Sequence, residues 1–159
     1  MLIKIIGCGV IVASSAKIGW DVAQGYAARV REIRAFQSGL GILRNEISFH
    51  NTVLSDALKS ASNVRNKQVA QMFQRASDRL AAVSNMTAAE AWSEALSACK
   101  PILSIKKDET EVLLEFGSQL GTGTIDDTLC TIQNAEEKLK LCERASADEE
   151  RRYAKLYRS

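Results

Sequence analysis

The chain has 159 residues, with 21 lysines and arginines against 19 aspartates and glutamates, which gives a formal charge of +2. This length allows one domain plus a short appendage, and a hydrophobic fraction of 46% excludes wholesale disorder. So small a net charge makes no general electrostatic case for nucleic-acid binding. The single histidine, His50, excludes most histidine-based catalysis and nearly all histidine-rich metal sites.

The sequence predicts no enzyme, no cofactor and no metal site. The carboxylate pairs Asp126-Asp127, Glu136-Glu137 and Glu149-Glu150 do not converge, because adjacent helix residues point about 100° apart. Ser14 and Ser15 have no histidine within local reach to act as a base. Four cysteines form no Cys-x-x-Cys pair and fit a reducing compartment, where buried cysteine is a small apolar filler; they are Cys8, Cys99, Cys130 and Cys142.

The first segment, Met1–Trp20, is apolar and admits several interpretations. A dinucleotide fingerprint at Gly7-Cys8-Gly9 is excluded because nothing after it resembles a strand. A lipoprotein signal is excluded because the six residues before Gly7-Cys8 leave no room for one. A cleaved secretory signal, a short uncleaved membrane anchor and a buried or interfacial helix remain open.

We predict the anchor over residues 1–20. Ile5–Ala16 is uncharged but short, and Lys4 and Lys17 extend it because their stems snorkel to the interface. Trp20 then lies at headgroup level, where an indole is favoured. Because basic residues are concentrated after this segment, the positive-inside rule places the N-terminus outside and residues 21–159 in the cytoplasm.

From Asp21 onward the periodicity is helical. A stripe of apolar residues from Val22 to Ile47 predicts a long first helix, interrupted by Gly39 and Gly41, which cost stability or allow a close helix contact. Thr52 is predicted to cap a short second helix. A third helix is predicted over Lys67–Leu80.

Three further helices follow. Thr87 and Glu90 form a capping-box pattern that opens the fourth helix, which Lys100-Pro101 stops. Asp108-x-x-Glu111 offers a weaker cap for the fifth, in which Gly117 marks a close packing point. The sixth starts at Thr124 and runs into a charged, amphipathic tail. The sequence therefore predicts an all-α, compact six-helix bundle with long first and last helices.

Arginines are concentrated early in the first helix, at Arg29, Arg31 and Arg34. With acidic residues such as Glu32 nearby and no aromatic stacking surface, they predict a solvated face and no nucleic-acid site, although anionic headgroups remain an alternative. From charge placement, we predict that exposed sides of the first and last helices bind partners, through Arg31, Arg34, Arg44, Glu149, Glu150, Arg151 and Arg152.

Four groups of residues carry a family resemblance by their order and spacing. They are Leu40-x-x-Leu43-x-x-Glu46-Ile47 leading to Thr52-x-Leu54-x-x-Ala57-Leu58, then Ala91-Trp92-x-x-Ala95-Leu96, then Leu113-Leu114-x-x-Gly117-x-x-Leu120-Gly121, and finally Tyr153-x-Lys155-x-Tyr157-Arg158-Ser159. In these motifs the chain resembles the stage III sporulation protein AB family, membrane proteins of endospore-forming bacteria.

The resemblance implies a fold similar to the helical cytoplasmic domain of the type II secretion system F protein. It implies a non-enzymatic scaffold of the sporulation channel apparatus in the mother-cell membrane facing the forespore. It also implies partners, namely the stage III sporulation protein AA ATPase and other channel proteins, and leaves self-association open. Family members continue past the match to Arg158 and Ser159 into a second apolar segment, which this sequence does not include. The alternative function is a secreted or periplasmic helical binding module, released by signal cleavage.

Overall fold

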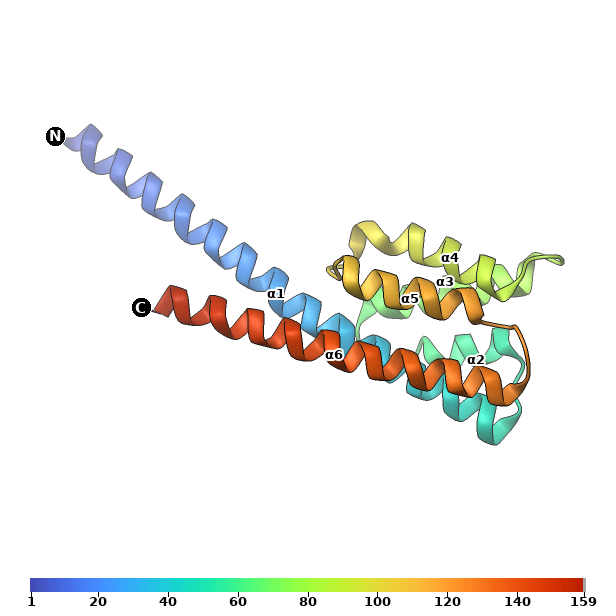
Figure 1. The fold of residues 1–159 in the computed structure, drawn as a ribbon. Helices are drawn as coiled ribbons and strands as arrows, with labels where there is room; N and C mark the ends of the chain where they lie inside the picture. The colour runs from blue at the N-terminus through green and yellow to red at the C-terminus, as the bar shows by residue number, and fades with distance from the viewer. Residues whose placement is uncertain (159) are drawn as a thin grey trace.

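A computed structural model describes residues 1–158, and within that range it contains six α-helices, one short 3₁₀ helix and no strand (Figure 1). The predicted all-α class, with long first and last helices, is confirmed. The helices are α1 (Leu2–His50), α2 (Leu54–Ala61), α3 (Lys67–Ala82), α4 (Ala88–Cys99), η1 (Lys100–Ile102), α5 (Lys107–Gln119) and α6 (Ile125–Arg158).

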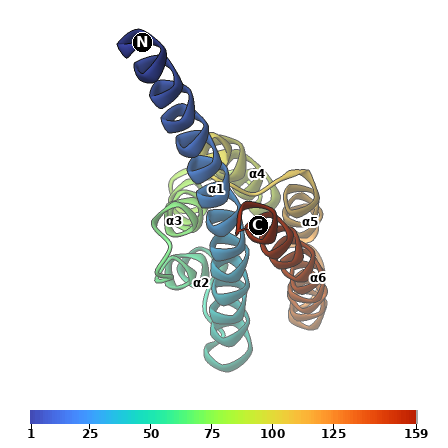
Figure 2. The same cartoon turned by 90° about the vertical axis from the view of Figure 1, so that its left-hand side faces the viewer.

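The helices pack in chain order as a closed ring, because short connections keep consecutive helices adjacent. Each α-helix contacts the next one along the chain, and α6 returns to lie antiparallel against α1, the most extensive of these contacts. Figure 2 shows the helices of this ring roughly end-on, with the N-terminal part of α1 projecting away from the ring. The two long helices therefore form one face of the bundle, and α1 alone continues beyond it.

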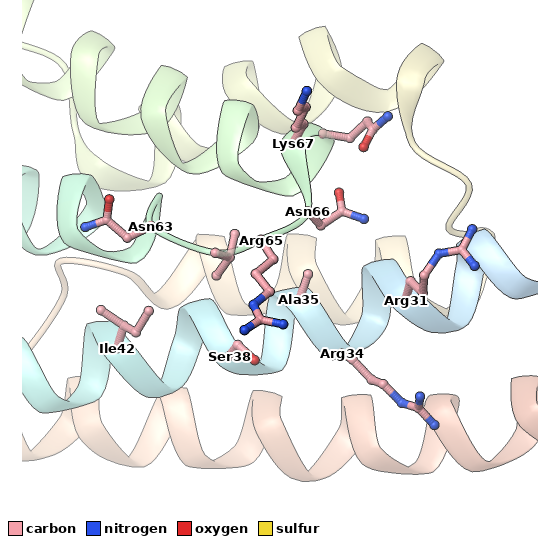
Figure 3. Close-up of a pocket in the computed structure, with 11 residues that line it drawn as sticks. Arg31, Arg34, Ala35, Ser38, Ile42, Asn63, Arg65, Asn66 and Lys67 are labelled. Carbon is pink, nitrogen blue, oxygen red and sulfur yellow. The ribbon is translucent and has the colours of Figure 1, made fainter.

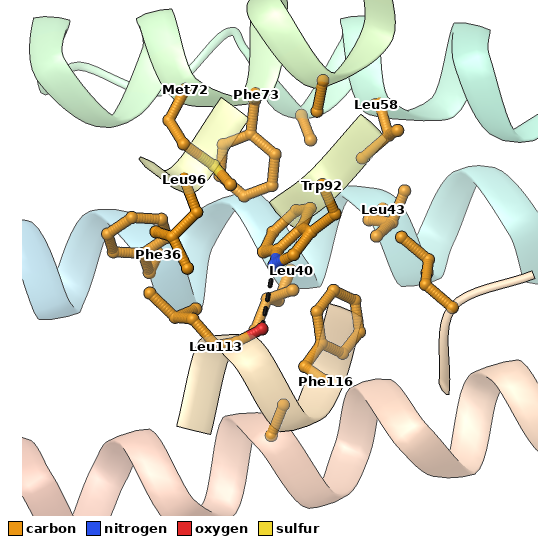
Figure 4. Packing of buried hydrophobic residues seen from close by; sticks show 14 of the residues in the cluster. Phe36, Leu40, Leu43, Leu58, Met72, Phe73, Trp92, Leu96, Leu113 and Phe116 are labelled. Atoms are coloured by element: carbon orange, nitrogen blue, oxygen red, sulfur yellow. Dashed lines mark hydrogen bonds between the residues drawn. The ribbon is translucent and has the colours of Figure 1, made fainter. Parts of the chain in front are cut away.

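Aromatic side chains fill the centre of the ring (Figure 4). Phe73 and Phe116 flank the fully buried Trp92, with ring centroids 5.6 and 4.9 Å from the indole, and Phe36 lies 6.0 Å from Phe73. The indole N–H donates a 2.8 Å hydrogen bond to the carbonyl of Leu113 in α5. One cluster thus joins α1, α3, α4 and α5, with its only polar atom satisfied.

Two glycines lie where helices approach this cluster most closely. A Cβ at Gly39 would meet the ring of Phe73, and a Cβ at Gly117 would meet the ring of Trp92. The predicted close packing is confirmed at Gly117, and at Gly39 the close contact is the one of the two predicted alternatives that holds. Gly41, one residue beyond the buried Leu40, has room, because its Cβ would lie 3.6 Å from Glu136 Oε1, an ordinary contact.

Replacing these two neighbouring glycines with alanine is expected to have opposite effects. Gly39→Ala forces the Phe73 ring to move and should destabilise the domain by about 1–3 kcal/mol. Gly41→Ala only improves helix propensity and should stabilise it by up to about 1 kcal/mol. Urea unfolding of both variants measures the difference, and equal effects would show that α1 and α3 pack less closely than here.

Most predicted helix ends are confirmed. α3 begins at Lys67, and the reciprocal bonds of the capping box between Thr87 and Glu90 open α4. α4 ends directly before Lys100-Pro101. Thr124 and Asp127 exchange similar hydrogen bonds at the start of α6. These signals depend on neighbours within one turn, which explains why the sequence alone reveals them.

Two predicted caps are wrong. Val53, without a side-chain cap, precedes α2, because Asn51 turns back in a left-handed conformation (φ 47°) and Thr52 instead donates to Glu46 Oε2 at 2.9 Å. At α5 the capping carboxylate belongs to Glu109, which accepts the Lys106 N–H at 2.7 Å. The predicted division at residues 20 and 21 falls inside the unbroken α1 and stays a prediction.

Candidate interaction surface

The α1–α6 face carries two of the predicted partner-binding arginines, and both are bonded within the chain. Arg34 Nε donates to Glu143 Oε1 at 2.7 Å, and Arg44 Nη1 donates to Glu136 Oε2 at 2.8 Å. The Arg34 guanidinium, by its hydrogen bond, holds the pKa of the Glu143 carboxyl below its usual range. Because both arginine side chains stay largely exposed, at 61% and 44%, these pairs tie α1 to α6 only weakly.

The charged cluster near the end of α6 is divided by the structure. Glu149 Oε2 accepts a 2.9 Å hydrogen bond from Arg29 and lies 3.7 Å from Lys106 Nζ, so it belongs to a contact inside the chain. Glu150 is half-buried, whereas Arg151 and Arg152 are exposed. Within residues 1–158, neither of these two arginines forms an ion pair, so they stay available to another molecule.

Arg29 is not on a solvated face, which corrects the sequence interpretation. It is 5% exposed and forms a bidentate pair with the fully buried Glu109, through Nε–Oε2 at 3.0 Å and Nη2–Oε1 at 2.6 Å. Burial lowers the pKa of Arg29, but the bonds and charges of Glu109 and Glu149 outweigh it and raise that pKa above its ordinary value. A buried charge is stable only when paired in this way.

Glu32 is also buried, at 3% exposed, where the sequence suggested a solvated residue. Its Oε2 accepts the backbone N–H groups of Ser104 and Ile105, at 2.6 and 3.2 Å, and so holds the segment before α5 against α1. Its burial has no counterpart in the local pattern, because the segment that covers it lies about seventy residues later. Burial raises the pKa of this carboxyl, and the two backbone hydrogen bonds oppose the rise.

The pKa of Glu32 predicts a pH dependence of stability. Because the raised pKa makes the folded state bind a proton more tightly than the unfolded state, this residue's contribution must fall as pH rises above the ordinary glutamate value of 4.5. Glu32→Gln keeps an oxygen acceptor for Ser104 and Ile105 and removes the titration. Urea unfolding between pH 4.5 and 8 should therefore show a smaller decline for the variant, and parallel curves would contradict the burial of a charged Glu32.

The other chemistry-bearing residues are scattered. Ser14 and Ser15 donate to the carbonyls of the preceding turn, and His50 is exposed at the end of α1. Within residues 1–158, no three histidine, cysteine, aspartate or glutamate side chains are placed to hold a metal ion. Cys99 is the buried apolar filler expected from the sequence, but Cys8 and Cys130 are exposed, which corrects that interpretation for both.

The N-terminal part of α1 is exposed from residue 2 to residue 18. α1 is the one described helix long and apolar enough to cross a membrane, with a mean hydropathy of 1.7 over its best 18-residue window. That window is only 6% buried. The end of α6 reaches this region: the ring of Tyr157 covers Gly19, and Tyr26 and Tyr153 pack with centroids 5.2 Å apart.

Comparison with known proteins decides the family. The model of the family "Stage III sporulation protein AB" matches residues 4–159, nearly the whole sequence. This chain belongs to the stage III sporulation protein AB family. The resemblance found in the sequence motifs is thereby confirmed, and membership implies a role in sporulation.

Two relatives support this membership. The stage III sporulation protein AB of Bacillus subtilis (strain 168) is 32% identical over 154 residues, which cover 97% of this chain and 88% of that protein. A solved structure of a stage III sporulation protein AB has a TM-score of 0.72 at 29% identity, covering 78% of this chain and 97% of that one. The similarity to the type II secretion system F protein stays a prediction.

Proposed function

We propose that this chain is a membrane-anchored, non-enzymatic scaffold of the sporulation channel apparatus, with its helical domain in the cytoplasm of the mother cell. The observation that carries the proposal is the bare apolar beginning of α1. Side chains such as Ile3, Ile11 and Val12 are 86%, 67% and 68% exposed. A contiguous apolar surface of this size on a folded chain marks a contact with a membrane or another protein.

The length of this apolar stretch favours a membrane over another protein as the surface that it contacts. At about 1.5 Å per residue, the helix from Leu2 to Trp20 extends about 27 Å, close to the roughly 30 Å hydrocarbon core of a bilayer. Lys4 and Lys17 lie near the two ends of this stretch, where their ammonium groups reach the interfaces. Trp20, 68% exposed, then lies at headgroup level.

The connection to the domain suits a scaffold. α1 runs unbroken from the apolar stretch into the core, so the domain is held at a constant orientation to the membrane. α6 returns to the same level, where Tyr157 contacts Gly19. The exposed Arg151 and Arg152 precede this contact by less than two turns, near the cytoplasmic headgroups.

Carbonate extraction of the full-length protein tests the anchor. We expect it to stay in the membrane fraction with Met1 retained. Val12→Asp, which places a charge within the span at a cost of about 2.5–3.5 kcal/mol, should release it. Val53→Asp is the matched control, because Val53 is also 68% exposed but lies outside the apolar stretch. A soluble form that begins after Ala16 would instead support the secreted module.

The proposed partners are the stage III sporulation protein AA ATPase and other channel proteins, and the proposed contact is the exposed α1–α6 face. The solvent-exposed Arg151 and Arg152 are the best candidates on that face. Pull-down with the purified ATPase should weaken for the double variant Arg151→Glu, Arg152→Glu and remain unchanged for Lys100→Glu, an exposed residue of η1. If the unmodified chain and both variants retained the ATPase equally, this contact would be overturned, while the proposed anchor would be unaffected.

A further inference from the structure

A basic groove lies along α1, next to the face that contacts α6, and Arg34 lies at the boundary between the two. It has a volume of about 650 Å³ and runs between the middle of α1 and the connection from α2 to α3 (Figure 3). Arg31, Arg65 and Lys67 line it, and none of its lining residues is an aspartate or glutamate. Ala35, Ile42 and Val64 add an apolar floor. The groove therefore combines an apolar surface with charged residues that are all positive.

The three cations lie outside the ion pairs of the described residues, and Arg31 interacts electrostatically with the adjacent carboxylate of Glu32. Among the ion pairs formed within residues 1–158, none includes Arg31, Arg65 or Lys67. Figure 3 shows Arg65 reaching from the connection toward α1, whereas Arg34, also in the lining, turns away toward α6. Arg34 is bonded there to Glu143. An acidic ligand in this groove would therefore meet cations that no ion pair within the described residues occupies.

The start of α3 adds to the positive potential. Asn66, also in the lining, caps the helix by accepting the Val69 N–H at 3.1 Å. The first turns of α2, α4, α5 and α6 each contain a carboxylate, whereas α3 has none and begins with Lys67. No carboxylate of its own first turn therefore neutralises the positive end of this 16-residue helix.

We propose that this groove binds an acidic, amphipathic segment of a partner protein. Apolar side chains of the segment rest on Ala35, Ile42 and Val64. Its carboxylates face Arg31, Arg65 and Lys67. The stretch of α1 from Arg31 to Ile42 is about 16 Å long, which accommodates about three turns of a helix. This mode of docking is that of an amphipathic helix in a groove, with charges at the rim.

The distance from the membrane argues against lipid headgroups as the ligand, a step that rests on the proposed anchor. Arg31 follows Trp20 by eleven residues, which is about 16 Å along α1. That exceeds the Debye length of roughly 8–10 Å at physiological ionic strength, so an anionic membrane surface would be largely screened at the groove. A segment of a partner protein can reach the groove at any distance from the membrane.

Fluorescence anisotropy with the full chain in non-ionic detergent micelles tests the proposal. The probe is a labelled synthetic peptide of about four helical turns, with leucines on one face and glutamates on the other. We expect the groove variant Arg31→Glu, Arg65→Glu, Lys67→Glu to weaken binding about tenfold or more. The same variant should bind a second peptide in which lysines replace the glutamates. The matched control, Arg75→Glu, Lys100→Glu, Arg144→Glu, changes three exposed cations outside the groove, has the same change in net charge and should bind the acidic peptide as the unmodified chain does.

Four results would overturn the proposal: no binding by the unmodified chain, equal weakening by the control variant, equal binding of a peptide with the same residues in scrambled order, or no binding of the lysine peptide by the groove variant. Nanodiscs distinguish a lipid ligand. If phosphatidylglycerol nanodiscs abolish peptide binding that phosphatidylcholine nanodiscs allow, the groove binds lipid and the proposal fails. Because the micelle measurement does not depend on membrane insertion, it stands apart from the extraction test of the anchor.

Discussion

Replacing Glu109 with alanine should destabilise the helical domain by about 3–5 kcal/mol. The substitution leaves the guanidinium of Arg29, which is 5% exposed, without its bidentate partner. It also removes the carboxylate that accepts the Lys106 N–H at the start of α5. Urea unfolding of the full chain in detergent micelles, followed by circular dichroism, measures the change.

Glu149→Ala is the control for this prediction. Glu149 bonds to the same Arg29, but its side chain is 50% exposed, so water replaces it and the cost should stay below about 1 kcal/mol. The double variant Arg29→Met, Glu109→Leu should recover much of the loss, because it buries no unpaired charge. A loss for Glu109→Ala no larger than for Glu149→Ala would show that the pair is hydrated and not buried.

Trp92→Ala should cost about 3–5 kcal/mol, the usual range for emptying a buried aromatic site. The indole is 0% exposed and lies between Phe73 and Phe116, so no surface side chain can fill the space that it leaves. Gly117 has no side chain on the α5 side to move inward. Thermal unfolding should show a lower midpoint, with the helical content at low temperature largely retained.

Trp92→Phe separates the hydrogen bond from the packing. It keeps an aromatic ring between α3 and α5 but removes the indole N–H that donates to Leu113. The expected loss is about 1–2 kcal/mol, clearly less than for alanine. If the phenylalanine variant lost as much as the alanine variant, the hydrogen bond, and not the volume of the ring, would dominate at this site.

The helices and the family could be predicted from the sequence because their signals are local or ordered along the chain. The apolar stripe from Val22 to Ile47 and the cap at Thr87 involve residues within one or two turns of each other, so they need no tertiary contact to be recognised. The close packing at Gly117 was predicted for the same reason: glycine within a helix is costly unless a neighbour needs the space. The same rule treats Gly39 and Gly41 alike, and only the structure shows the close approach at Gly39.

The failed cap at Thr52 shows where local rules stop. Threonine is a good cap, but the backbone at Asn51 turns it back toward Glu46. The competing conformation is also local, and sequence alone does not rank the two. The exposed Cys8 and Cys130 illustrate a related point: burial is a property of what covers a residue, and residue type gives only its tendency.

The sequence by itself determined the all-α class, the succession of helices, the apolar first segment and membership of the family. Only the tertiary structure decided which charges are buried. Arg29 meets Glu109 across 80 positions, and Arg31, two residues later, lines a groove with Arg65. In the sequence of α1 these arginines look alike, because helical periodicity predicts on which face of the helix a side chain lies. It does not predict whether another helix covers that face. Their different roles arise from the packing of helices that lie far apart in the chain.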